Sequence, residues 1–342
     1  MARPRWLTVK TLAFSLFLLI IPASYEPSRA APSIKIAVAY DVGGRGDRAA
    51  NDAVAMGVDL AKKNLKLTSL DIREMVTDGT EKDRSRRLRF LANAGYSVII
   101  AVGAGYEKAV QTVSLEFPEL TFAIIDDGHI SNLNVQSLIF DAQQGSYLAG
   151  VLAASASKTN RVGFIGDVGF VTSPAQAAAF SQGAKSIKPK ISVTITIPVS
   201  NSVSTAVASM HSAGVDVIYS NWIQNSGLLD SIISLNSKEA PMKLIGVLPD
   251  QYWLQSSRSK GILIGAFTKH LENAAYDAIW YGLKNQILGD VLQENPNVYG
   301  KLYSLKEAGI GLALTGEGQR YSAVIKSVSS LLKSGKVTIA SF

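Results

Sequence analysis

The sequence contains no cysteine among its 342 residues, so disulfide bonds, thiolate metal ligands and catalytic thiols are all excluded. A chain of this length can bury enough apolar surface to fold without disulfides, so their absence does not argue against an oxidising compartment. We also expect no lipid anchor, because the N-terminal cysteine that would carry one is missing.

Histidine is scarce as well. The three histidines are His129, His211 and His270, and their spacing matches no metal-binding pattern. The H-E-x-x-H, G-x-S-x-G and P-loop patterns do not occur. Asp126 and Asp127 could bind a cation, but adjacent acids at a strand end more often cap a helix or bind hydroxyl groups. We therefore predict no metal, no cofactor and no enzymatic activity.

Long apolar runs are lacking after the first thirty residues, so we expect a soluble mature chain. Before that point, a basic start with Arg3 and Lys10 leads into "TLAFSLFLLIIPA", which is too short to span a bilayer comfortably. "PSRA" follows, with small residues at Ser28 and Ala30. Residues 1–30 are predicted to be a signal peptide cleaved after Ala30, which places the protein in the periplasm; a retained membrane anchor is the alternative.

A strong charge of either sign is also lacking. The formal net charge is +7, and the first thirty residues hold four Lys/Arg and one acid, which leaves +4 for the remaining 312 residues. The densest basic stretch is "EKDRSRRLRF", residues 81–90, which we interpret as a helix with a solvated basic face. No aromatic platform accompanies it, so we expect no nucleic-acid partner.

Short apolar strands alternate with helices, and this alternation occurs twice, which is typical of parallel sheets covered on both faces. The first series of expected strands comprises 34–40, 70–76, 97–103 and 121–126, with helices at 51–64 and 105–117 and a further helix from about 143. The second comprises strands 161–167, 192–199, 215–222 and 243–250, with helices near 174–187, 203–213 and 226–236. A strand at 261–269, a helix at 271–288, a short strand with a link, and a helix at about 320–334 complete the chain.

Polar side chains and one aromatic residue follow several of these strands. Because ligands of such sheets bind outside the carboxyl ends of the strands, these positions are the candidate binding residues. The alternative is that each simply caps the next helix. They are Asp41, Gly103 and Asp126 in the first half, and Asp167, Asn221, Trp222 and Asp250 in the second.

The loop "GGRGDRAAN" after the first strand fits the dinucleotide pattern G-x-G-x-x-G/A. Asp47, however, lies where that motif places a pyrophosphate, and a carboxylate repels phosphate. The next acid at a strand end, Asp78, lies about 30 residues beyond the loop instead of the usual ~20. We therefore expect the glycines to let the backbone turn tightly against a neutral ligand.

Several stretches together resemble the basic membrane protein family, the nucleoside-binding proteins of ABC transporters. They are "DVGGRGDRAANDAVAMG", "AVGAGYEKAVQTVSLEFPELTFAIID", "FDAQQGSYLAGVLAA", "RVGFIGD" with "FSQGAK", "LIGVLPDQ" and "GILIGAFTK". The family usually has glutamate at the position of Gln144. The resemblance extends from about Ile34 to the end of the chain.

The resemblance implies an α/β type I periplasmic-binding-protein fold with two doubly wound lobes, three crossovers and a ligand in the cleft. We expect the first lobe to comprise residues 31–145 with about 268–305. The second would comprise about 146–267 with about 306–342. The crossovers are expected near 143–147, 266–270 and 300–312.

By the same resemblance, five residues fall on ligand-contacting positions: Asp47, Asn51, Asp126, Asp250 and Lys269. Asp41 joins them as a candidate from its place at a strand end. Two departures matter. The family commonly has an aspartate, associated with the ribose, where this chain has Leu248, and an aromatic residue where it has Ala50. Other aromatic residues are candidates for stacking on a base: Trp222, Tyr106 and Trp253.

The expected function is that of an extracytoplasmic solute-binding protein of an ABC importer. It would bind a nucleoside or nucleoside-like molecule, deliver it to the permease and act as a monomer. One alternative is a periplasmic receptor for another heterocyclic or sugar-like metabolite, used for sensing. A nucleoside hydrolase is the second alternative, and it would need an acid/base pair or a metal in the cleft.

Overall fold

The computed structural model describes residues 34–169, 172–198, 203–222, 227–236, 241–249, 257–292 and 295–340. The expected signal peptide and two candidate site residues, Asp250 and Trp253, lie outside these ranges. None of the helices in the described ranges is both long enough and apolar enough to cross a membrane.

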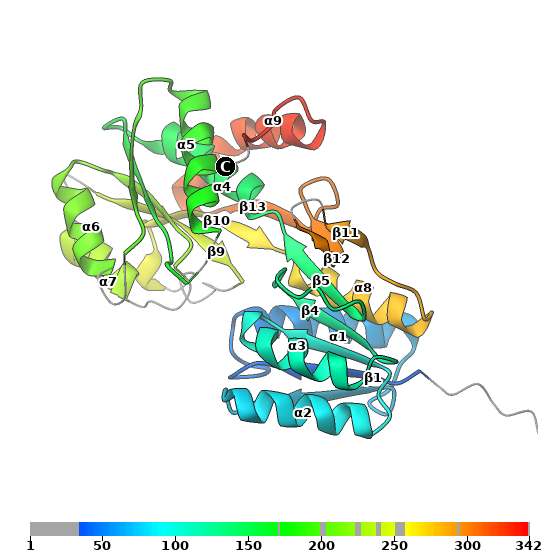
Figure 1. The fold of residues 1–342 in the computed structure, drawn as a ribbon. Helices are drawn as coiled ribbons and strands as arrows, with labels where there is room; N and C mark the ends of the chain where they lie inside the picture. Colours follow the sequence, from blue (N-terminus) through cyan, green and yellow to red (C-terminus); the bar gives the residue numbers. More distant parts are fainter. Residues whose placement is uncertain are drawn as a thin grey trace, which may run out of the picture. The chain divides into compact units, whose positions relative to one another are not determined.

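The described strands form two sheets (Figure 1). The seven-stranded sheet has the order β11 (Asp290–Leu292), β12 (Asn295–Tyr303), β5 (Val135–Phe140), β4 (Thr121–Ile125), β3 (Val98–Val102), β1 (Ile36–Tyr40), β2 (Ile72–Val76). The six-stranded sheet has the order β13 (Ile310–Leu314), β10 (Leu263–Lys269), β9 (Lys243–Leu248), β8 (Val217–Ser220), β6 (Arg161–Ile165), β7 (Ser192–Thr196). All pairings are parallel except β11 with β12 and β10 with β13.

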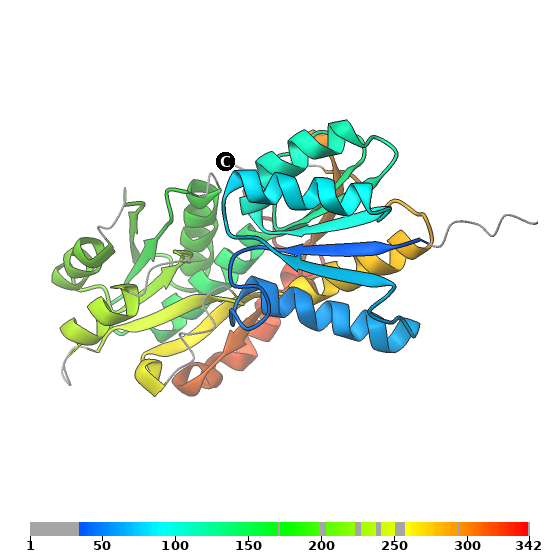
Figure 2. The same ribbon diagram turned by 90° about the horizontal axis from the view of Figure 1, so that it is seen from below.

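Helices cover both faces of the seven-stranded sheet because its central strands are apolar on both sides. Alternate residues of β1 show this: Val38 packs in one core cluster and Ala39 in another. Helix α1 (Ala50–Leu65) packs against α8 (Leu271–Leu283) on one face, and α2 (Glu81–Asn93) against α3 (Glu107–Glu116) on the other (Figure 2).

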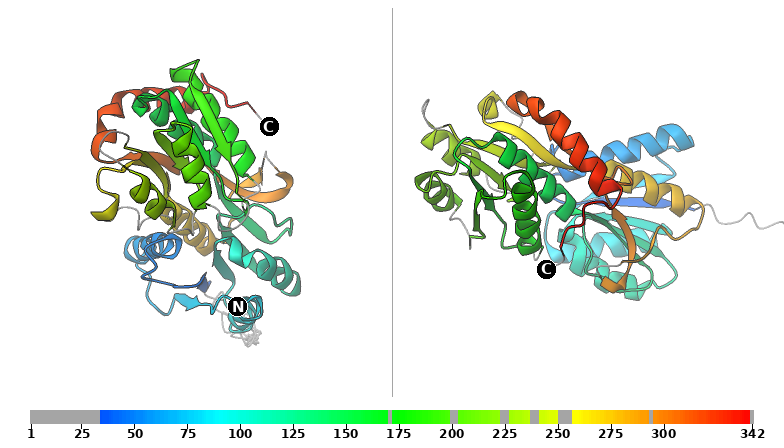
Figure 3. Two further views of the ribbon diagram at one scale, coloured as in Figure 1. Left: turned by 90° about the vertical axis from the view of Figure 1, so that its left-hand side faces the viewer. Right: turned by 90° about the horizontal axis from the view of Figure 1, so that it is seen from above.

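The six-stranded sheet is covered in the same way. Helices α4 (Ala142–Ala156) and α5 (Ser173–Ile187) belong to one core cluster, while α6 (Val203–Ser212) and α7 (Gly227–Leu235) belong to another. The C-terminal helix α9 (Ser322–Lys333), red in Figure 3, contacts α4. Glycines let α4 and α5 pack closely, since a Cβ on Gly183 would lie 2.0 Å from the carbonyl oxygen of Tyr147.

The chain passes between the two sheets three times, as the family resemblance implies. It leaves β5 through α4 to β6, leaves β10 through α8 to β11 and β12, and leaves β12 through a short link to β13. Each crossover therefore falls near the segment that the resemblance implies. The α/β class with two doubly wound halves is confirmed.

Three strands, among them the short and unexpected β11, and one helix end differ from the sequence expectation. Strand β5 was missed because Gln136 interrupts its apolar run, yet this side chain is buried and its Oε1 accepts a hydrogen bond from the N–H of Leu288, 3.1 Å away. Strand β13 was expected to be a link. Helix α8 ends at Leu283 instead of 288, because Asn285 adopts a φ of 50°, a left-handed conformation that ends helices.

The basic stretch at the start of α2 is not simply a solvated face. Arg84 pairs with Asp41, Arg87 pairs with Asp83, and the side chain of Arg84 is only 14 % exposed. Apolar positions elsewhere on the helix are buried, as expected. The expected helix is confirmed, but two of its arginines serve as internal counter-ions.

Candidate functional site

The glycine-rich loop between β1 and α1 is held to the start of α1 by a carboxylate. Asp47 accepts hydrogen bonds from the backbone N–H groups of Ala49 and Asp52 at Oδ1, 2.8 and 3.1 Å away, and from that of Asn51 at Oδ2, 3.1 Å away. A dinucleotide phosphate would need these same N–H groups. Asp47 therefore closes the helix terminus, which argues against a phosphate-binding loop.

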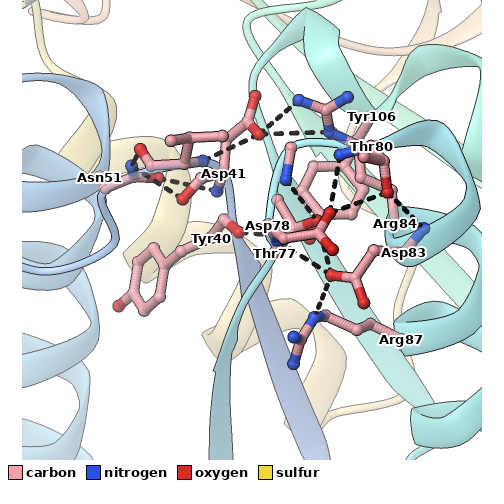
Figure 4. Close-up of polar contacts among 12 residues, drawn as sticks. Tyr40, Asp41, Asn51, Thr77, Asp78, Thr80, Asp83, Arg84, Arg87 and Tyr106 are labelled. Carbon is pink, nitrogen blue, oxygen red and sulfur yellow. Dashed lines mark hydrogen bonds and ion pairs between the residues drawn. The ribbon is translucent and has the colours of Figure 1, made fainter.

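Asn51 holds the end of β1. Its Oδ1 accepts from the N–H of Asp41, 3.0 Å away, and its Nδ2 donates to the carbonyl oxygens of Val42 and Asp41, 3.1 and 3.3 Å away. The residue is 3 % exposed, so the amide is used within the loop (Figure 4).

Asp41 lies beside an arginine and a buried tyrosine. Its Oδ1 accepts from the Nη2 and Nε of Arg84, 2.6 and 3.2 Å away, and the guanidinium lies over the ring of Tyr106, 5.6 Å from its centroid (Figure 4). The hydroxyl of Tyr106 donates to the carbonyl oxygen of Tyr40, 3.2 Å away. Burial, reinforced by the charge of Asp41, raises the pKa of Tyr106, so this phenol stays neutral.

A cavity of about 670 Å³ lies at the carboxyl ends of strands from both sheets. One wall comes from the turn after β4, the start of α3 and the start of α4. The other comes from the ends of β8, β9 and β10 and from the segment that leads into α5. The two halves of the chain thus contribute to one site, at the edge where ligands of doubly wound sheets bind.

Asp126 and Lys269 both line this cavity and form an ion pair across it. The Nζ of Lys269 lies 2.6 Å from the Oδ2 of Asp126, and the two side chains are 10 % and 29 % exposed. Asp126 follows β4 and adopts a φ of 65°, a left-handed conformation that aspartate tolerates better than most residues. Lys269 is the last residue of β10. The pair joins the two sheets at the cavity.

The wall from the second half carries neutral polar groups. Asn221 is buried, and its Oδ1 accepts from the N–H of Asp167, 2.9 Å away. Its Nδ2 donates to Ser173 Oγ and Gln176 Oε1, 3.2 and 3.0 Å away. Gln176 in turn donates to Thr172 Oγ1, 3.0 Å away. Asn221, Gln176 and Thr172 all line the cavity with orientations fixed by these bonds.

Two phenylalanines that sequence reasoning did not select also line the cavity. Phe140 ends β5 and stacks on Tyr303, with 5.2 Å between ring centroids. Phe267 packs tightly on α4, where a Cβ on Gly145 would lie 2.2 Å from its ring. Strand periodicity could have found Phe267, because residues two apart on a strand share a face and Lys269 was already a candidate.

The structure brings only part of the predicted site together. Of the candidate residues that it describes, Asp126, Asn221 and Lys269 line the cavity, and the remainder are not among its lining residues. Trp222 is 8 % exposed and belongs to a hydrophobic cluster that includes Ile165 and Leu228. Tyr106 is fully buried. The other candidates outside the lining are Asp41, Asp47, Asn51, Gly103 and Asp167.

The cavity is richer in acids than in bases among the described residues. Its lining includes the carboxylates of Glu107, Asp126, Asp127 and Asp141, against the ammonium of Lys269 and the imidazole of His129. Such a wall favours hydroxyl and amine donors and repels phosphate. The site is therefore suited to a neutral or cationic polar molecule with an apolar face.

Known proteins show the same fold. A solved ABC transporter solute-binding protein from Conexibacter woesei superposes with a TM-score of 0.66 and 17 % identity, covering 90 % of this chain and 98 % of the other. The predicted type I periplasmic-binding-protein fold is thereby confirmed.

Sequence comparison finds relatives of higher identity. An antigen of Listeria monocytogenes, described as a CD4+ T-cell-stimulating antigen, is 32 % identical over 191 residues, which cover 54 % of this chain and 53 % of the relative. The match thus spans about half the length of that relative. The "ABC transporter nucleoside-binding protein BmpA" of Lactococcus lactis is 25 % identical over 329 residues, covering 93 % of this chain and 92 % of the relative.

Most of the folded region also matches one family. The family described as "ABC transporter substrate-binding protein PnrA-like" matches residues 34–333. This is a family of solute-binding proteins and not of enzymes, and its members act outside the cytoplasm. The resemblance drawn from the sequence motifs is confirmed, and the chain belongs to the PnrA-like family of ABC transporter substrate-binding proteins.

Proposed function

We propose that the protein binds a nucleoside or nucleoside-like molecule in the cavity between its two sheets and delivers it to an ABC permease. The observation that carries this is the Asp126–Lys269 pair, which lies in one cavity with two aromatic side chains and a fixed set of amides. A volume of about 670 Å³ suits a small polar ligand. The description of the Lactococcus lactis relative as nucleoside-binding supports this ligand class.

Each wall would take a different part of the ligand. Asp126 would accept hydrogen bonds from sugar hydroxyls, which are strong because the acceptor is charged. Asn221 and Gln176 would meet the polar edge of the base. Phe140 and Phe267 would supply apolar contact with the base.

The remaining candidate residues keep proposed roles of two kinds. Asp41, Asp47, Asn51 and Tyr106 would act by shaping the first-half edge, since their described bonds lie within it. Direct contact with the ligand remains our prediction for Asp250 and Trp253, and also for Trp222, although its side chain packs in a hydrophobic cluster outside the cavity lining.

Transport would use closure of two lobes on the ligand, which favours the closed form and so the form that docks on the permease. The lobes we propose are residues 31–145 with about 268–305, and about 146–267 with about 306–342. We further propose a monomer in the periplasm, exported through a cleaved signal peptide, with no lipid anchor and no catalysed reaction.

Calorimetric titration of the purified protein with inosine, adenosine, uridine, ribose and AMP tests the ligand class. We expect a nucleoside to bind and AMP to bind far more weakly. Asp126→Asn should weaken nucleoside binding about tenfold or more, since a hydrogen bond to a charged group contributes about 1.5–3 kcal/mol. Asp59→Asn, an exposed carboxylate paired with Arg45 outside the cavity lining, is the matched control.

Three outcomes would contradict the proposal. Tighter binding of ribose or AMP than of any nucleoside would point to the alternative receptor. Release of free base from inosine, followed by chromatography, would reveal a hydrolase. If Asp126→Asn and Asp59→Asn changed nucleoside affinity equally, the cavity would not be the binding site. Uptake of labelled nucleoside by cells with and without the gene tests delivery to the permease.

A further inference from the structure

Three potential metal ligands meet on the first-half wall of the cavity. The side chains of Glu107, Asp127 and His129 each offer one ligand atom, and these atoms all lie within 4.8 Å of one another. His129 Nδ1 lies 3.2 Å from Asp127 Oδ2 and 3.9 Å from Glu107 Oε2. Asp127 and His129 belong to the turn after β4, while Glu107 is the first residue of α3.

The carboxylate of Asp127 is buried without a lysine or arginine beside it among the described residues. Its side chain is 0 % exposed, and its hydrogen-bond partners in the described chain are the backbone N–H of His129, 3.1 Å from Oδ1, and the His129 ring. A buried carboxylate is costly unless a cation compensates it. The neighbouring Asp126 has such a cation in Lys269, whereas Asp127 is turned toward the imidazole and Glu107.

We propose that Glu107, Asp127 and His129 bind a divalent transition-metal ion, with Zn²⁺ as the best match. Two ligand atoms on one tetrahedral Zn²⁺ lie about 3.3 Å apart, given bond lengths of about 2.0–2.1 Å. The 3.2 Å between His129 and Asp127 already fits, and Glu107, whose side chain is 45 % exposed, has room to close its 3.9 Å.

Charge and access agree with this assignment. A neutral imidazole and two carboxylates balance the two charges of Zn²⁺, and imidazole favours Zn²⁺ over Mg²⁺ or Ca²⁺. All three residues line the cavity, so an ion there has an entry path. Three protein ligands leave a fourth position open, as in Zn²⁺ sites that bind an exchangeable molecule. The site does not depend on which organic ligand the cavity takes.

The proposal is tested by titrating metal-free, untagged protein with Zn²⁺ alone, with binding measured by calorimetry. The visible spectrum of the Co²⁺ form is a second measurement. We expect one ion per chain with micromolar or tighter affinity. His129→Asn and Glu107→Gln should each weaken Zn²⁺ binding at least about tenfold. Mutation of a residue that only hydrogen-bonds to a metal ligand already has an effect of about that size. Binding should also weaken as the pH falls, because protons compete with the metal ion for its ligands.

His270→Asn is the matched control. His270 Nδ1 lies 2.7 Å from Glu272 Oε1, a closer histidine–carboxylate pair than that of His129, but neither residue belongs to a three-ligand group in the described chain. Binding should be unchanged in this variant. The proposal is overturned if wild-type protein binds no Zn²⁺, or if His270→Asn weakens binding as much as His129→Asn. Glu107→Gln keeps the test valid if a variant at Asp127 fails to fold, since Glu107 is half-exposed.

Discussion

The two halves of the chain fix their strand ends by different means. In the first half, charged pairs predominate: Asp41 with Arg84, Asp83 with Arg87, and Glu74 with Lys62 (Figure 4 shows the first two). In the second half, the end of β6 is held by the neutral side chains of Asn221 and Ser173. These contacts of the first half therefore depend on the ionisation of acids, whereas the end of β6 depends on neutral hydrogen bonds that do not titrate.

One hydrogen bond is common to both halves and sharpens the comparison. A backbone N–H just after the first strand of each sheet is donated to an asparagine. Asp41, the first residue after β1, donates to Asn51, and Asp167, the second residue after β6, donates to Asn221. Asn51 comes from the following helix and does not line the cavity, whereas Asn221 comes from the neighbouring strand end and does. The same bond therefore contributes to architecture alone in one half, and to architecture and the proposed binding surface in the other.

The largest expected effect is that of Asn221→Ala. The change removes one hydrogen-bond partner from the N–H of Asp167 and from the side chains of Ser173 and Gln176. The free energy of unfolding should therefore fall by about 2–4 kcal/mol. Nucleoside affinity should fall about tenfold or more. Urea denaturation and calorimetry measure the two quantities, and unchanged affinity would separate Asn221 from the binding surface.

Acidification should weaken the first half before the second. Burial alone would raise the pKa of Glu74, but hydrogen bonds from Arg45, Lys62 and Tyr40 outweigh it and lower the pKa from 4.5 to about 2. A lowered folded-state pKa stabilises the protein above the unfolded value and loses that contribution as the pH falls. We expect a loss of about 2 kcal/mol between about pH 4.5 and 2, reduced from the full shift because Arg45 is partly exposed.

Hydrogen exchange at low pH can locate this loss. Protection should fall first in β1 and β2, while β6 and β7 stay protected, since the edge strand β7, "SVTIT", contains no acid. Glu74→Gln should flatten the pH dependence in this range. If both sheets lost protection at the same pH, the two halves would not differ in their sensitivity to acid.

Asn51→Ala should affect stability alone. The amide makes bonds of 3.0 and 3.1 Å to the loop after β1, and losing them should cost about 1–2 kcal/mol. Because Asn51 is not among the cavity-lining residues, nucleoside affinity should stay within about twofold of wild type, well under the factor of ten that 1.4 kcal/mol represents. A loss of affinity as large as that of Asn221→Ala would show that Asn51 contacts the ligand after all.

The smallest effect concerns His270, at the crossover from β10 to α8. A hydrogen bond to Glu272 raises the pKa of His270 above its ordinary 6.5, against the lowering effect of burial. The charged form thus stabilises the folded protein at low pH, and this contribution disappears as the pH rises through the folded-state pKa. An NMR titration should show the raised pKa of His270, and Glu272→Gln should lower that pKa. If Glu272→Gln left the pKa of His270 unchanged, the hydrogen bond to Glu272 would not be its cause.

Periodicity predicted most of the parallel strands and their covering helices, because each depends on local apolar patterns, and the family resemblance implied the three crossovers. Strand β5 escaped this reasoning, since Gln136 becomes compatible with burial only through its bond to Leu288. Of the site, the sequence supplied Asp126, Asn221 and Lys269, which all line the cavity. It did not select Phe140 or Phe267, whose approach to the cavity depends on packing against Tyr303 and Gly145.

The sequence by itself determined the fold class and the family, because hydrophobic periodicity and glycine-containing motifs are properties of neighbouring residues. Only the tertiary structure decided which polar strand ends reach the cavity. Asp41 and Asp126 look alike in sequence, yet the first is paired with Arg84 and the second faces Lys269 across the cavity. Partners so distant along the chain are selected by how the sheets and helices pack, which no local pattern records.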